Sequence, residues 1–134
     1  MTRVRSGRLL AALVLAASVL AHPAGAEGPT EPKPGVRLQG LDRVTARIST
    51  IDAAIDAPVT FGALQITVRS CMATPPTEPP ESAAFLQIDE VVEDQAPRRV
   101  FSGWMFASSP SASAMEHPVY DVWVLTCLDE APAG

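Results

Sequence analysis

The segment from residue 109 to residue 121 holds the residue types of a hydrolytic triad. Ser109 and Ser111 precede His117, and Asp121 follows it. In such a triad the histidine takes a proton from the serine, and a carboxylate orients the histidine. These roles depend on hydrogen-bond geometry, which nearness in sequence does not supply. We therefore favour a structural role, in which His117 hydrogen-bonds the backbone where the last strand begins and Asp121 binds amides of the preceding loop.

Other motifs that carry chemistry are missing. The chain has no glycine-rich phosphate loop, no Gly-x-Ser-x-Gly, no His-Glu-x-x-His and no Cys-x-x-Cys. The carboxylates between Asp89 and Asp94 lack the spacing of a calcium loop and predict a solvated turn. After residue 26, His117 is the only histidine, whereas protein zinc sites usually hold more nitrogen or sulfur ligands. We expect no metal, no cofactor and no enzymatic activity.

The first 26 residues have the pattern of a secretory signal peptide. The basic start consists of Arg3, Arg5 and Arg8. An apolar run from Leu9 to Leu20 follows, and Ala24-Gly25-Ala26 places small residues before a cleavage site, so that the mature chain begins at Glu27. The run is shorter than the ~20 apolar residues that span a bilayer, and no cysteine lies directly behind it to carry a lipid. The pattern predicts an exported, periplasmic protein with no stable membrane anchor after cleavage.

The predicted mature chain is acidic. It keeps seven of the ten basic residues and all fifteen acids, so its net charge is −8, against −5 for the whole chain. Such a charge repels nucleic-acid phosphates and anionic lipid headgroups. The one adjacent basic pair, Arg98-Arg99, follows an acidic stretch. We therefore expect no nucleic-acid partner.

The two cysteines, Cys71 and Cys127, both lie in the predicted mature chain. An even number of cysteines in an oxidising compartment favours a disulfide, and two buried thiols are the alternative. A bridge that closes a loop of this length stabilises a fold by roughly 4 kcal/mol in the chain-entropy model. The bridge would therefore supply a large share of the stability of a small domain.

Composition and hydrophobic alternation divide the chain into a signal peptide at 1–26, a disordered lead-in at 27–37, a single β domain at 38–128 and a flexible tail at 129–134. Alternation predicts strands over 44–49, 55–61, 64–69, 83–92, 100–106 and 119–128. The proline-rich segment 74–80 predicts a stiff connector. Apart from one short helical turn over 111–116, we expect no helix. The fold class is all-β, an antiparallel sandwich or small barrel of about six to seven strands.

Two strands raise specific questions. By strict alternation Cys71 would fall on the polar face of its strand, and a bulge or strand end near Ser70 would turn it inward. The strand over 100–106 carries apolar residues on both faces, which predicts a central, well-covered strand. These two expectations can be compared directly with a structure.

Five segments resemble one known family: Leu41-Asp42-Arg43-Val44-Thr45-Ala46, Phe61-Gly62-Ala63-Leu64, Ala84-Phe85-Leu86-Gln87-Ile88, Phe101 to Pro110 and Glu116 to Trp123. On these residues the chain resembles an alphaproteobacterial family of exported proteins catalogued as domain of unknown function 2155. The resemblance covers roughly Leu38 to Leu128. The resemblance implies a bacterial host and a periplasmic location, and it brings no activity, substrate or catalytic residue with it.

Three functions remain open at this point. We rank first a non-enzymatic interaction or envelope-assembly module whose partner is another envelope protein, second a binder of small ligands or cell-wall fragments with a pocket lined by Trp104 and Trp123, and last a hydrolase that uses the segment 109–121. The candidate interaction surface consists of Trp104, Met105, Phe106, His117, Tyr120, Asp121 and Trp123. Aromatic and methionine side chains are enriched at interaction patches, although a core needs the same residues for packing.

Overall fold

The computed structural model describes residues 17–18 and 28–133. The predicted cleavage site and nearly all of the predicted signal peptide lie outside these residues. The elements are β1 (Glu31–Pro32), β2 (Gly35–Asp42), β3 (Arg47–Ala54), β4 (Val59–Phe61), β5 (Leu64–Ala73), β6 (Ser82–Glu90), β7 (Arg98–Phe106) and β8 (Tyr120–Leu128). No helix occurs in the described part of the chain, and the predicted helical turn near residue 111 is a non-helical turn.

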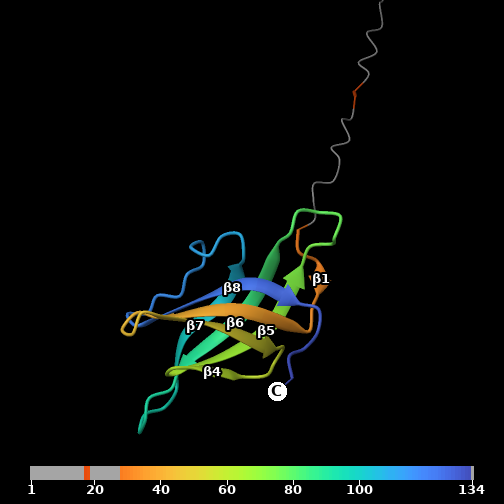
Figure 1. The fold of residues 1–134 in the computed structure, drawn as a ribbon. Coiled ribbons are helices and arrows are strands. Elements are labelled where there is room, and N and C mark those ends of the chain that lie inside the picture. Colours follow the sequence, from red (N-terminus) through yellow and green to blue (C-terminus); the bar gives the residue numbers. More distant parts are fainter. Residues whose placement is uncertain (1–16, 19–27, 134) are drawn as a thin grey trace, which may run out of the picture.

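The strands form two antiparallel sheets that pack face to face (Figure 1). The larger sheet has the order β1-β5-β6-β7, with β4 also paired to β5, and the smaller sheet has the order β3-β2-β8. Alternate residues of each strand enter the space between the sheets. The core therefore combines side chains such as Leu86 and Ile88 of β6 with Leu38 of β2 and Val124 of β8, all of them fully or almost fully buried. The predicted all-β class is confirmed, and the architecture is a sandwich.

A disulfide joins the two sheets. Cys71 of β5 is bonded to Cys127 of β8, 56 residues further along the chain. The register between β5 and β6 shifts between Val68 and Ser70, so Cys71 turns to the buried face of its strand. This shift is the irregularity that the apolar and polar alternation around Ser70 had required.

The N-terminal boundary of the domain was predicted wrongly. The lead-in was expected to be disordered up to residue 37, but β1 pairs with β5, and β2 already begins at Gly35. Val36 is completely buried. The three prolines of this segment suggested disorder, because proline cannot donate a hydrogen bond to a strand ladder. Proline is nevertheless compatible with a short edge strand such as β1.

The predicted flexible tail also makes contacts with the sandwich. Asp129 forms an ion pair with Lys33 at 2.8 Å. The backbone oxygen of Glu130 lies so close to Gly35 that a Cβ atom there would come within 3.1 Å of it. Both contacts hold the chain beyond β8 against the start of β2.

The strands expected over 44–49 and 55–61 are displaced in the structure. Residues 43–46 form the turn between β2 and β3, because the Asp42 carboxylate accepts the backbone N–H groups of Val44 and Thr45 at 2.9 and 3.2 Å. A second turn contains Asp56, whose φ is 62°, so β4 begins only at Val59. Side-chain hydrogen bonds of aspartate to nearby amides favour turns over strands, and alternation alone does not register them.

The expectation of a central, covered strand over 100–106 is wrong. β7 is the last strand of the five-stranded sheet and pairs with β6 alone. Its inward residue Met105 is 2% exposed, whereas Trp104 and Phe106 on the other face are 42% and 36% exposed. The apolar residues of the second face are therefore a surface feature and not a sign of a second covering layer.

Candidate functional site

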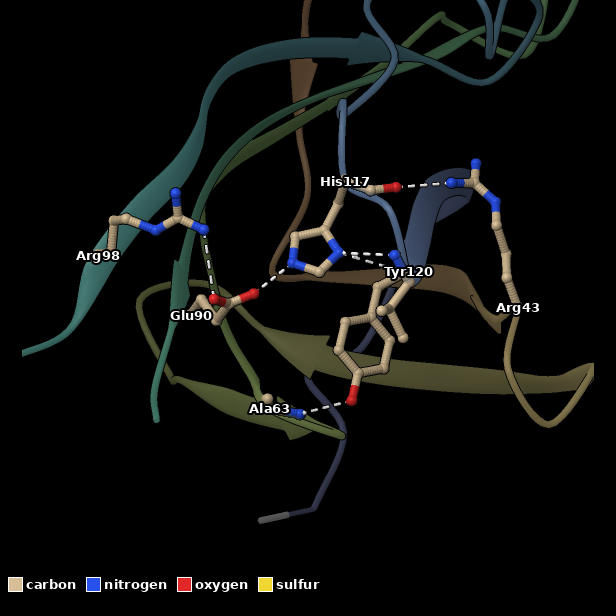
Figure 2. Close-up of polar contacts among 7 residues, drawn as sticks. Arg43, Ala63, Glu90, Arg98, His117 and Tyr120 are labelled. Carbon is tan, nitrogen blue, oxygen red and sulfur yellow. Dashed lines mark hydrogen bonds and ion pairs between the residues drawn. The ribbon is translucent and has the colours of Figure 1, made fainter. Parts of the chain in front are cut away.

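His117 lies at a corner where the connection from β7 enters β8, and it is 8% exposed. Its Nδ1 accepts the backbone N–H groups of Val119 and Tyr120 at 3.0 and 3.1 Å. Its Nε2 contacts the carboxylate of Glu90 (Figure 2). Because Nδ1 acts as an acceptor, Nε2 carries the proton and donates it to Glu90. His117 does hydrogen-bond the backbone where the last strand begins, as predicted.

Glu90 connects this corner to β7. Its second oxygen accepts a hydrogen bond from the Arg98 guanidinium at 3.3 Å. The hydrogen bond from His117, and secondly that from Arg98, hold the pKa of the Glu90 carboxyl below its ordinary value, against the opposing effect of desolvation. Glu90 therefore stays ionised and fixes the ring of His117.

Arg43 closes the other side of the corner. Its guanidinium donates to the backbone oxygen of His117 at 2.6 Å and forms an ion pair with Asp121 at 3.5 Å. Its backbone N–H donates to the oxygen of Val119 at 2.8 Å. Asp121 thus pairs with Arg43, and none of its hydrogen bonds in the described structure goes to a loop amide, contrary to the expectation from sequence.

Tyr120 anchors the hairpin between β4 and β5 to this corner. Its hydroxyl accepts the N–H of Ala63 at 3.2 Å, and its ring packs edge-on against Phe61 with centroids 5.7 Å apart. Gly62 in the hairpin turn has a φ of 56°, and a Cβ atom there would lie 2.5 Å from the Tyr120 hydroxyl. Glycine is required at this position both for its backbone conformation and for space.

The residues of the hypothetical triad do not come together. Both ring nitrogens of His117 are engaged by the backbone and by Glu90, so neither is oriented toward a serine. Ser109 belongs to a turn, in which its N–H donates to Phe106. Ser111 and Asp121 line a shallow hollow of about 340 Å³ that also borders Trp123, and His117 does not border it. The arrangement has the geometry of a structural corner.

The seven residues expected to form one interaction surface are divided among four places. Met105 lies in the core, and His117, Tyr120 and Asp121 belong to the corner. Trp104 and Phe106 lie on the outer face of the larger sheet. Trp123 alternates with the buried Val122 and Val124 and so lies on the outer face of the smaller sheet. The two tryptophans therefore cannot line a common pocket, which removes the structural basis of the expected ligand cavity.

The outer face of the larger sheet carries a cluster of apolar side chains at one end. The strand registers place Phe85 beside Trp104 and Ala83 beside both Met72 and Phe106. The rings of Phe85 and Trp104 meet edge to face with centroids 5.5 Å apart. We call this set the outer aromatic face; it comprises Met72, Phe85, Trp104 and Phe106 together with Ala83, which is itself buried. Sequence analysis missed Met72 and Phe85, although Phe85 alternates with the core residues Ala84 and Leu86.

The charges of the described chain are unevenly paired. Six of its seven basic residues form ion pairs: Lys33, Arg37, Arg43, Arg69, Arg98 and Arg99. Several carboxylates have no cationic partner among the described residues: Glu93, Asp94, Glu116 and Glu130.

Over the same residues no cluster of three or more His, Cys, Asp or Glu side chains is suited to a metal ion. Within residues 17–18 and 28–133, no helix is long and apolar enough to cross a membrane.

The fold and the corner together define a small β-sandwich domain that is held by one disulfide between its sheets. The chain belongs to a bacterial family described as "Uncharacterized protein conserved in bacteria (DUF2155)", whose family model matches residues 36–127. An uncharacterized protein of Rickettsia prowazekii (strain Madrid E) is 28% identical over 92 residues, which are 69% of this chain and 59% of that protein. The chain thus matches less than two thirds of this relative's length. No solved structure matches it.

Proposed function

We propose that this protein is a periplasmic, non-enzymatic domain that binds another protein of the cell envelope through its outer aromatic face. The supporting observation is the exposure of Trp104 and Phe106 on the face of a sheet whose other face already forms the core. An antiparallel sheet with one solvated face ordinarily carries polar residues there. Clustered aromatic residues on such a face are typical of the centre of a binding interface.

The periplasmic location is supported by the signal-peptide pattern and by the disulfide. Disulfides form and persist in oxidising compartments and are rare in the cytosol. N-terminal sequencing of the protein from its host should begin at Glu27. An abundant soluble form that retains Met1 would contradict export and would leave the disulfide without a suitable compartment.

A pair of substitutions tests the proposed surface. Trp104→Thr with Phe106→Thr should reduce recovery of the partner in crosslinked pull-downs from the periplasm by about thirtyfold, since hot-spot residues commonly contribute 2 kcal/mol or more to binding. The matched control is Val44→Thr with Ile48→Thr, which removes two apolar residues that are 78% and 58% exposed elsewhere on the molecule. Equal recovery with both double variants would contradict the proposal.

The same variants distinguish a protein partner from a cell-wall ligand. We expect purified peptidoglycan sacculi not to retain the wild-type protein. Retention that disappears with the Trp104 and Phe106 double variant would instead identify the outer aromatic face as a glycan-binding surface and would overturn the protein partner.

A further inference from the structure

The backbone of β7 has a free edge beside the outer aromatic face. Ala107 donates its N–H to the oxygen of Ser82 at 2.9 Å, which makes these two residues a hydrogen-bonded pair. In an antiparallel ladder, hydrogen-bonded pairs alternate with non-bonded pairs. Met105 and Gly103 therefore bond to β6, while Ser102, Trp104 and Phe106 direct their N–H and C=O groups away from the sheet.

These edge groups have almost no backbone partners. The oxygen of Phe106 accepts the N–H of Ser109 at 3.2 Å. For the N–H groups of Ser102, Trp104 and Phe106, and for the oxygens of Ser102 and Trp104, residues 28–133 supply no backbone hydrogen bond. The residues with unpaired backbone groups thus include those whose aromatic side chains are exposed.

Two of the other three sheet edges are protected in ways that natural proteins commonly use. The opposite edge of the larger sheet, along β5, is covered by β1 at one end and β4 at the other. The free edge of β3 carries the charged residues Arg47 and Asp52. The third of these edges is β8, which pairs with β2 alone; there the N–H groups of Tyr120 and Cys127 donate to the side chains of His117 and Ser82.

The segment Val100–Phe106 of β7 has neither a charge nor a proline. Long, apolar, unprotected edges are templates for pairing with another chain.

We propose that an extended segment of the partner protein adds to β7 as a further strand and places alternate side chains against Trp104 and Phe106. This inference rests on the proposed function, because it specifies how the same surface binds. A row of alternating backbone donors and acceptors is complementary to an extended polypeptide, which supplies the same groups at the same spacing. In this mode of recognition the main chain provides affinity and the neighbouring side chains provide specificity.

Charge indicates that the added strand belongs to a different protein and not to a second copy. Residues 28–133 carry seven basic and fourteen acidic side chains, and most of the basic ones are already paired. Two such chains repel one another, whereas a segment with basic residues attracts the unpaired carboxylates. The partner segment is accordingly apolar at alternate positions and flanked by Lys or Arg.

The first test uses peptides as probes. Random peptides displayed on phage are selected on the protein purified from its host, and the selected peptides are synthesised. The expected sequences alternate apolar residues and carry basic flanks. On binding, amide hydrogen exchange at Ser102, Trp104 and Phe106 should slow by about tenfold or more, while the amides of Gly103 and Met105, already bonded to β6, should change little. Protection without this alternation, or no selected peptide at all, would overturn strand addition.

The second test blocks the edge without removing an aromatic ring. Ser102→Pro removes an outward N–H and leaves the ladder to β6 intact, because proline is tolerated where the N–H of an edge strand faces solvent. It should weaken peptide and partner binding by about tenfold or more. The matched control is Thr50→Pro on β3. Ile55 donates to the oxygen of Pro34, so by the same alternation Thr50 also points away from its sheet.

The outcomes separate this inference from the proposed function. Loss of the partner with the Trp104 and Phe106 double variant but not with Ser102→Pro would preserve the docking face and overturn strand addition. Insensitivity to both changes would overturn both proposals. If Ser102→Pro unfolds the protein, the exchange pattern of the wild type decides alone. A dimer in gel filtration that the same substitution dissociates would assign the edge to a second copy and overturn the separate partner.

Discussion

The His117 corner and the free edge of β7 differ in two respects: whether they contain chemically reactive side chains, and whether their polar groups have hydrogen-bond partners. The corner has a histidine, two carboxylates, two arginines and a tyrosine, but its polar groups bind one another or the backbone. The β7 edge has no reactive side chain, yet most of its outward backbone groups have no backbone partner among the described residues, and the rings of Trp104 and Phe106 are partly exposed to solvent. Folding leaves the β7 edge, and not the corner, with groups that can bind another molecule, and for this reason we place the proposed function at the edge.

The disulfide sets the largest expected effect and does not depend on either region. Replacing both Cys71 and Cys127 by Ser should lower the free energy of unfolding by about 2–5 kcal/mol, the usual loss for a native bridge in a small secreted domain. Urea denaturation of the variant and the wild type measures the difference. Unchanged stability would mean that the two sheets are held together by their apolar contacts alone.

At the corner, His117→Ala should lower the free energy of unfolding by about 1–3 kcal/mol, because it leaves two backbone N–H groups and the Glu90 carboxylate without their partner. For a domain of this size each kcal/mol corresponds to about 4–8 °C in Tm. Partner binding should be retained in the folded variant. Normal stability combined with lost binding would reverse the comparison and make the corner the functional site.

The corner should also lose stability in acid. The pKa of Glu90 is lower in the folded protein than its ordinary value, chiefly through the hydrogen bond from His117. Its contribution is therefore present at pH values above the unfolded pKa and is lost as pH falls through the folded pKa. Glu90→Gln should reduce stability at neutral pH and make the loss between neutral and acidic pH smaller than in the wild type. Denaturation curves at several pH values measure this difference, and Glu93→Gln in the neighbouring exposed turn serves as the control.

The smallest stability effect is expected at the β7 edge. Trp104→Thr should change the free energy of unfolding by less than about 1 kcal/mol, since its ring is half exposed and its main contact is the edge of Phe85. The same variant should nevertheless lose the partner. A large fall in stability with binding retained would show that the outer aromatic face serves packing, and Ile48→Thr gives the baseline for removing an exposed apolar residue.

Local patterns predicted much of the fold but little of the edge and corner. Alternation located the strands that became β5, β6, β7 and β8, and the parity of Cys71 correctly required an irregularity near Ser70. The same patterns missed β2, because the proline-rich segment that precedes it resembled a disordered segment. They also assigned His117 a backbone contact without indicating Glu90, which lies 27 residues away in sequence.

The sequence by itself determined the all-β class, the family, the presence of one pair of cysteines and the acidic charge, because these properties follow from composition, periodicity and short motifs. Only the tertiary structure decided which strands stand at the edges, which ring nitrogens are occupied and which face of β7 meets solvent. Strand order depends on pairing between distant segments, and period-two alternation is the same in a central and an edge strand. Trp104 and Met105 are adjacent apolar residues in the sequence, and the packing of the smaller sheet on one face of the larger sheet buries Met105 and leaves Trp104 exposed.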